Sequence, residues 1–132
     1  MIRRAALAAT LLLTLAACNP TTYDSSADTT LPPSTSSTLP AGTLQELLPR
    51  MQHEVAGLSA LVITGKGDGE SATRIEQYWA ALTPEVTTRW PDLVEDFNFV
   101  VRLCRDAADR RRPANADRAA KNLDALATAV LG

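Results

Sequence analysis

Apolar residues in the C-terminal part of the chain recur at spacings of three and four positions, with polar residues between them. This period is typical of amphipathic helices that bury one face. Thr43 and Glu46, at the start of the first stripe, have the spacing of a capping box. Pro49 predicts either a kink or a later start of the regular helix, and Gly65 is expected to end it. The apolar members of this stripe are Leu44, Leu47, Leu48, Met51, Val55, Leu58 and Val62.

A second stripe follows the glycine-rich residues 65–69, which predict a loop between helices. We expect Asp68 or Ser71 to cap the second helix. Residues 83–85 combine a capping threonine, a proline suited to the first helical position and an acidic first turn, and so predict a kinked or restarted short helix. The stripe consists of Ala72, Ile75, Trp79 and Leu82, and Val86 and Trp90 continue it after the proline.

Two further stripes lie between Asp92 and the C-terminus. The third has acidic residues in its first turn and arginines at its end, which suits the helix dipole. On its polar face, Arg102 with Asp106 and Arg105 with Asp109 are four positions apart and are predicted to pair. Pro113 separates the third stripe from the fourth, and Asn115 is the expected cap of the fourth. The third comprises Leu93, Val94, Phe97, Val100, Val101, Cys104 and Ala108, and the fourth Ala116, Ala119, Ala120, Leu123, Leu126, Ala127, Val130 and Leu131.

These segments predict an all-α fold, a small antiparallel bundle of three to four helices formed by residues 43–132. About 90 residues suffice for one core and are too few for two domains. The short β-branched run at residues 61–64 ends a helical stripe and has no partner strand, so it does not change the fold class.

Residues 18–42 have a different composition from the helical part. After the cysteine at position 18 they are almost entirely threonine, serine, proline, aspartate and alanine, without an apolar period. Such a segment cannot bury enough surface to offset the entropy of ordering it. We therefore expect a disordered tether, which as a flexible coil would span roughly 27 Å and fully extended roughly 75 Å. Its serine and threonine residues are also possible acceptors of O-glycans.

The first residues combine a positive start at Arg3 and Arg4, an apolar run from Ala5 to Leu15 and the sequence Leu15-Ala16-Ala17-Cys18. This order resembles the signal peptide and lipobox of bacterial lipoproteins. The resemblance implies cleavage of residues 1–17, lipid attachment to the Cys18 thiol through a diacylglycerol, and anchoring at the extracytoplasmic face of the cell membrane. The alternatives are a general secretory signal cleaved near Ala17 and a plain membrane anchor, for which the apolar run is short.

Charge is distributed unevenly in the helical part. Residues 102–121 contain seven basic and three acidic residues, a net charge of +4, whereas residues 43–101 contain four basic and nine acidic residues, a net charge of −5. Four arginines are therefore candidate contacts for an anionic partner, which could be lipid headgroups, a wall polymer or an acidic protein. The alternative is a helix end matched to its dipole. The net charge of −2 does not favour a nucleic-acid partner. The four arginines are Arg110, Arg111, Arg112 and Arg118.

Catalytic and metal-binding patterns are not evident. His53 is the one histidine of the chain, so we predict no histidine-based metal site, no cofactor and no catalytic residue. Cys104 falls on an apolar helix face and is expected to be a small buried side chain. An enzyme is therefore not predicted.

The function expected from these features is that of a tethered interaction module for an envelope protein or wall component. The alternative is a small-ligand or ion-binding accessory of a transporter, with aromatic side chains lining a pocket between helices. Those aromatic residues are Tyr78, Trp79, Trp90 and Phe97.

Overall fold

Four helices follow one another along residues 38–132, the part of the chain that the computed structural model describes. They are α1 (Leu44–Thr64), α2 (Asp68–Arg89), α3 (Val94–Asp109) and α4 (Pro113–Leu131), with a 3-10 turn, η1 (Pro91–Leu93), before α3. No strand occurs within these residues. The predicted signal peptide (1–17), Cys18 and most of the predicted tether lie outside the described residues.

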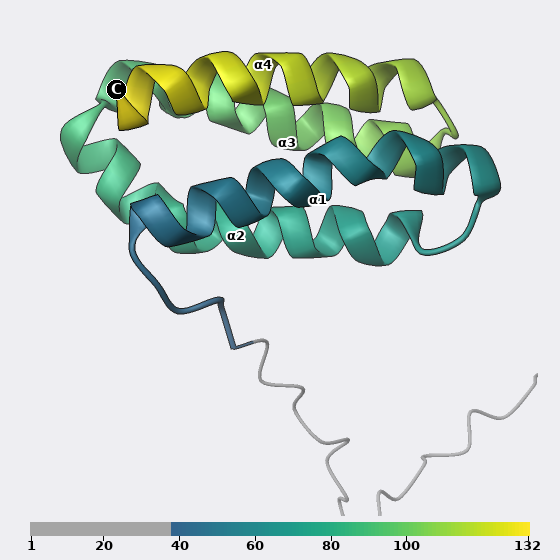
Figure 1. Cartoon of the computed structure of the whole chain (residues 1–132), viewed down its shortest axis with the longest axis horizontal. Coiled ribbons are helices and arrows are strands. Elements are labelled where there is room, and N and C mark those ends of the chain that lie inside the picture. Colours follow the sequence, from purple (N-terminus) through teal and green to yellow (C-terminus); the bar gives the residue numbers. More distant parts are fainter. Residues whose placement is uncertain (1–37) are drawn as a thin grey trace, which may run out of the picture. The chain divides into compact units, whose positions relative to one another are not determined.

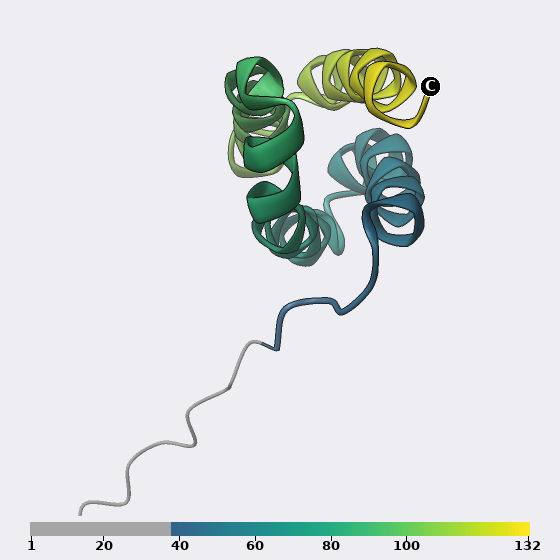
Figure 2. The same cartoon turned by 90° about the vertical axis from the view of Figure 1, so that its left-hand side faces the viewer.

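The helices run alternately up and down and form a four-helix bundle (Figure 1). Viewed along the bundle, α1 packs against α2 and α4, and α3 packs against the same two helices from the opposite corner (Figure 2). The α1–α2 loop and the α3–α4 turn therefore lie at one end. The start of α1, the α2–α3 turn and the C-terminus lie at the other end. The predicted all-α antiparallel bundle is confirmed.

The core is formed by the four apolar stripes. Each helix buries most of its apolar side chains between its neighbours and leaves its polar face exposed. Ile63, Phe99 and Leu131 are the large apolar side chains of the helices that remain exposed within residues 38–132. Trp79 and Phe97 stack in the core, with ring centroids 5.0 Å apart and planes 6° from parallel. The largest fully buried side chains are Phe97, Leu44, Leu47, Leu48, Met51, Leu58, Ile75, Leu82, Leu123, Val55, Val86 and Val100.

Helix α1 begins and ends where the sequence predicts. The Glu46 carboxylate accepts hydrogen bonds from the Thr43 backbone N–H (2.9 Å) and hydroxyl (3.1 Å), and these bonds lower the pKa of Glu46. Gly65 ends the helix in the left-handed conformation, with φ 66°. The helix continues through Pro49, so the later start at that residue is wrong.

Helix α2 differs more from expectation. It runs unbroken past Pro84 to Arg89, so the restarted short helix is wrong. The Thr83 hydroxyl, expected to cap that restart, donates instead to the Trp79 carbonyl at 2.7 Å, inside the same helix. Neither expected cap occupies the N-cap position of α2, which is Gly67: Asp68 is the first helical residue, and Ser71 is buried inside the helix. None of the helices in residues 38–132 is long and apolar enough to cross a membrane.

The ion pairs on α3 form mostly with partners other than those four positions apart. Arg102 pairs with Glu95 at 2.6 Å and not with Asp106. Arg105 reaches Asp109 only at 3.8 Å, and binds the Glu76 carboxylate of α2 with two nitrogens, at 2.8 and 2.7 Å. Two-point binding of a carboxylate by arginine is the stronger geometry. Arg105 therefore joins α3 to α2.

Candidate interaction surface

Three of the four candidate arginines lie together in the tight turn between α3 and α4. Arg112 N–H donates to the Ala107 carbonyl at 2.9 Å, and Arg111 N–H donates to the Ala108 carbonyl at 3.4 Å. This pair of bonds is the Schellman arrangement that ends a helix. It requires a left-handed residue, and Arg111 takes that conformation with φ 51°. Pro113 then starts α4 at its first position.

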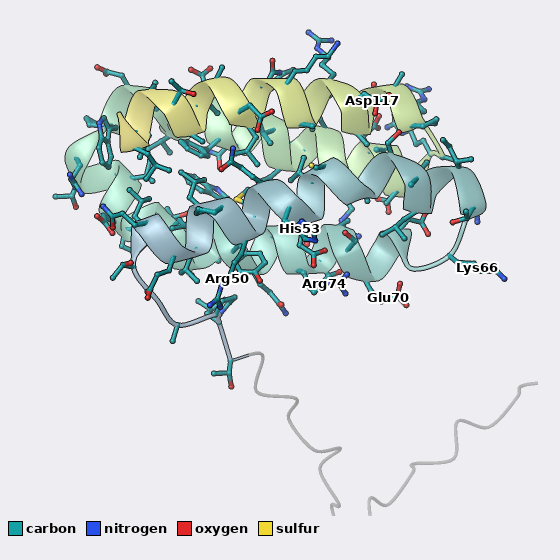
Figure 3. All side chains as sticks on the ribbon, in the orientation of Figure 1. Arg50, His53, Lys66, Glu70, Arg74 and Asp117 are labelled. Atoms are coloured by element: carbon teal, nitrogen blue, oxygen red, sulfur yellow. The ribbon has the colours of Figure 1, made fainter. Side chains whose placement is uncertain are left out.

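The same end of the bundle brings the α1–α2 loop against this turn. A β-carbon built on Gly65 would overlap the Arg111 guanidinium, so the two loops touch at these residues. Lys66 follows Gly65 and points away from the bundle at this end (Figure 3). Lys66 therefore adds a fourth positive charge at the end of the bundle that carries Arg110, Arg111 and Arg112. We call these four residues the basic end.

Asp106 holds the turn in place. Its carboxylate forms an ion pair with Arg110 Nε at 2.9 Å, accepts a hydrogen bond from Asn115 Nδ2 at 2.6 Å, and lies 3.9 Å from Arg112 Nη1. Asn115 was expected to cap α4, but it lies inside the helix and its side-chain amide donates to Asp106. Arg112 occupies the N-cap position in its place. The turn is thus fixed by one carboxylate that sequence spacing had assigned to Arg102.

The arginines of the turn remain available despite these contacts. The side chains of Arg110 and Arg112 are 64% and 56% exposed, and Arg111 is exposed without an ion pair in the described part of the chain. Guanidinium groups present several N–H donors in a plane that fits carboxylate and phosphate oxygens. Within residues 38–132, Arg111 and Lys66 form no ion pair, and Arg110 and Arg112 share Asp106, so their donors can bind an external anion. The carboxylates of Asp68, Glu70, Asp109 and Asp117 lie at the same end of the bundle.

Arg118 lies elsewhere. Its guanidinium carbon is 5.5 Å from the centroid of the Phe99 ring of α3, on the side face between α3 and α4. Phe99 precedes the end of α3 by ten residues, about 15 Å along the helix. The structure therefore groups Arg110, Arg111 and Arg112 but places Arg118 on a different surface.

The aromatic residues proposed to line a ligand pocket are mostly packed within the bundle. Phe97 is fully buried, and Trp79 is nearly so, with its Nε1–H donating to Asn98 at 2.8 Å. Trp90 is half-buried beneath the Arg89 guanidinium, 4.3 Å from the ring centroid. Tyr78 is also half-buried against the core. These contacts explain the positions of the four aromatic side chains as packing within the bundle, without a ligand pocket.

One polar cluster joins α1 to α2. The buried Ser71 hydroxyl donates to Glu54 at 3.0 Å, and Arg74 donates to the same carboxylate oxygen at 3.1 Å. Partial burial raises the pKa of Glu54, but these hydrogen bonds outweigh it and the net pKa is lowered. A depressed pKa makes Glu54 a weak base, and the buried Ser71 is out of reach of a substrate. His53 is exposed on the same side of the bundle as Arg74 (Figure 3).

Other chemistry-bearing groups are arranged as structural residues. Burial and the nearby Glu76 raise the pKa of the Cys104 thiol to about 12, so it stays protonated at neutral pH. Within residues 38–132, no three His, Cys, Asp or Glu side chains gather in a way that would hold a metal ion. Comparison of the chain with protein-family models, curated proteins and solved structures finds no match.

Proposed function

We propose that the chain is a lipid-anchored extracytoplasmic protein whose helical domain is an interaction module. The Cys18 lipid would hold it at the cell membrane, and residues 19–42 would act as the tether. The basic end would contact an acidic envelope protein or an anionic wall polymer. The lipobox resemblance supports the anchor, and the clustering of Lys66, Arg110, Arg111 and Arg112 supports the contact surface.

The observation that carries this proposal is the position of the basic end relative to the start of the domain. Thr43, where the tether joins, lies at one end of α1, and the basic end lies beyond the other. Helix α1 has 21 residues, a length of about 31 Å. The acidic residues Asp92, Glu95 and Asp96 lie near the tether end.

This polarity favours a partner beyond the domain over the lipid surface. A basic end next to the tether would be drawn to anionic headgroups, whose potential falls off within about 8 Å at physiological salt. In this bundle Arg110, Arg111 and Arg112 lie at the far end, roughly the length of α1 from Thr43, beyond the reach of that potential. Acidic residues lie at both ends, Asp92, Glu95 and Asp96 at the near one and Asp68, Glu70, Asp109 and Asp117 at the far one. The surface therefore fits an acidic protein or a phosphate-bearing polymer on the outer side.

The anchor is tested by labelling. The full chain and its Cys18→Ala variant are expressed in a bacterial host with a clickable palmitate analogue. Label on the wild type alone is the expected result, since the thiol is the attachment point. Equal absence of label from both proteins would overturn the anchor and leave a secreted domain.

The contact surface is tested with defined anions. Binding of polyglutamate, polyglycerol phosphate and anionic vesicles is measured for the wild type and for Arg110→Gln/Arg111→Gln/Arg112→Gln. We expect at least about a tenfold loss of polymer binding, equivalent to about 1.4 kcal/mol, and weaker binding to vesicles than to polymers. Arg50→Gln/Arg89→Gln/Lys121→Gln removes the same charge from other exposed positions and serves as the control. Equal losses in both variants would indicate general charge attraction and contradict a defined surface.

A further inference from the structure

A shallow groove runs along the outer face between α3 and α4, separate from the basic end. It has a volume of about 340 Å³ and is lined by Asp96, Phe99, Asn122, Ala125 and Leu126. Phe99 is 36% exposed, whereas Phe97, two residues earlier, is fully buried in the core. An aromatic side chain left at the surface next to an apolar groove is a typical anchor for a protein partner.

Two opposite charges flank this ring, and both lack an ion-pair partner within residues 38–132. The Arg118 guanidinium lies over the Phe99 ring and contacts no carboxylate, unlike Arg102, Arg105 and Arg110. Asp96 lines the groove and forms no ion pair. Both charges are therefore free to bind groups outside the domain.

The antiparallel packing of α3 and α4 sets the order of these groups along the face. Asp96 precedes Phe99 by nearly one turn of α3, toward the end of the bundle that carries Thr43. Arg118 precedes Asn122 by about one turn of α4, toward the basic end. The face thus presents a carboxylate, an aromatic ring and a guanidinium in sequence along the bundle axis.

We propose that this face binds the same face of a second copy of the chain around a two-fold axis that passes close to Phe99. Rotation by 180° about that axis brings Asp96 of each copy opposite Arg118 of the other. The two Phe99 rings meet at the centre, between two equivalent ion pairs. A self-complementary patch is the requirement for a two-fold dimer, and this order of charges meets it.

The size of the face indicates a weak dimer. Helices α3 and α4 contain 16 and 19 residues, about 24 and 29 Å in length. With axes about 10 Å apart, the pair presents roughly 500 Å². Stable interfaces bury about 800 Å² on each partner. We therefore expect a dissociation constant in the micromolar range or weaker, which becomes weaker as salt increases.

The experiment measures self-association of residues 18–132 carrying Cys18→Ser, which excludes a disulfide through that position. Sedimentation velocity between about 5 and 500 µM covers the expected range of affinity. The wild-type surface should move from monomer to dimer with concentration. Asp96→Arg and Arg118→Asp should each remain monomeric, because each places like charges opposite one another.

Two combinations then distinguish this geometry from other dimers. An equimolar mixture of Asp96→Arg and Arg118→Asp should form a heterodimer, since both ion pairs are restored with reversed polarity. The double variant Asp96→Arg/Arg118→Asp should again form a homodimer. Asp92→Arg and Arg50→Asp, at exposed positions outside the groove, are the matched controls and should dimerise normally.

Neutral variants show whether a loss of association is caused by a loss of folding. Asp96→Asn, Arg118→Gln and Phe99→Ala should keep the helical circular dichroism and cooperative melting, and each should weaken association at least about threefold. A monomer at every concentration overturns the proposal, as does a dimer that the charge reversals leave intact or fail to restore. The proposal does not rest on the proposed function, because this assay uses neither the lipid nor an anionic partner, and residues 110–112 remain unchanged.

Discussion

Two residues in the left-handed conformation end two helices at the same end of the bundle, and they differ in chemistry. Gly65, with φ 66°, has no side chain to clash. Arg111, with φ 51°, places its β-carbon in a conformation that costs roughly 1 kcal/mol for an L-residue. The costly residue is also one of the exposed cations of the basic end. Backbone strain and a candidate contact residue thus coincide at Arg111.

Arg111→Gly is expected to raise the free energy of unfolding by roughly 0.5–1 kcal/mol, because glycine takes the left-handed conformation without a steric cost. Arg112→Gly is the control. Arg112 has φ −114°, so glycine relieves nothing there and should destabilise the domain slightly. Urea denaturation of both variants measures the difference. Equal effects of the two substitutions would contradict the assignment of strain to Arg111.

The burial of Cys104 leads to a second prediction about a single residue. Its folded-state pKa is about 12, above the ordinary 9.0, so the unfolded thiol ionises first as pH rises. The contribution of Cys104 to stability is therefore full below about pH 9 and is lost as pH rises toward about 12. In the Cys18→Ser background, the thiol should react with a disulfide reagent only after urea unfolding. Rapid reaction of the folded protein would contradict its burial.

The helices show how much of the fold can be predicted from residues that are close together in the sequence. The apolar stripes, the Gly65 end and the Glu46 cap follow from residues a few positions apart, and they are confirmed except for Leu131 of the fourth stripe, which is exposed. The roles of Ser71 and Asn115 depend on Glu54 and Asp106, in α1 and α3 respectively. Capping propensity describes a helix in isolation and cannot include a partner on another helix. The same reason explains why Arg105 binds Glu76 of α2 more closely than Asp109.

Helix α2 continues through Pro84, which gives a prediction about one element. A proline inside a helix removes one backbone hydrogen bond and crowds the preceding turn. Pro84→Ala is therefore expected to raise the free energy of unfolding by about 1–3 kcal/mol, because propagation of the helix past this point no longer carries that cost. Pro113→Ala is the control, since a proline at the first position of α4 has no such bond to lose. Thermal melts of the two variants decide. If Pro84→Ala does not raise the free energy of unfolding, other contacts in the bundle already compensate for the hydrogen bond that Pro84 lacks.

The contact between α1 and α2 predicts a pH dependence. The pKa of Glu54 is lowered in the folded state, so its contribution to stability is present above its ordinary value of 4.5 and is lost as pH falls through the folded pKa. Glu54→Gln should cost about 1 kcal/mol at pH 7, and its difference from wild type should narrow in acid. Denaturation at several pH values measures this. Glu70→Gln, at an exposed position on α2, should cost less, and a constant difference for Glu54→Gln across the range would contradict the ion pair.

At the scale of the whole molecule, the bundle redistributes a charge asymmetry that runs along the sequence. Sequence counting placed the positive charge in residues 102–121 as a block. Folding divides that block, since Arg110, Arg111 and Arg112 join Lys66 at one end, Arg105 joins α2, and Arg118 turns to the side groove. Only the antiparallel topology brings Lys66 to this cluster, because 44 positions separate it from Arg110. The sequence therefore predicted Arg110, Arg111 and Arg112 as members of this surface, missed Lys66, and included Arg118, which lies elsewhere.

Reach is the last property of the whole molecule that can be tested. If residues 19–42 are a tether, they add roughly 27 Å of coil to a domain whose first helix is about 31 Å long. Deletion of residues 20–37 should then reduce crosslinking of Arg110-containing peptides to envelope partners in intact cells, while lipid labelling at Cys18 and melting of the domain stay unchanged.

A glycine and serine segment of equal length is the matched control and should restore the crosslinks, since a flexible chain of the same length reaches as far. If the replacement fails while the natural segment succeeds, residues 20–37 act through their own sequence, by binding or by glycosylation, and not as a spacer. Unchanged crosslinking after the deletion would mean that the partner lies close to the membrane surface, within reach of the shortened protein. The orientation of the basic end away from Thr43 would then no longer favour binding of that partner.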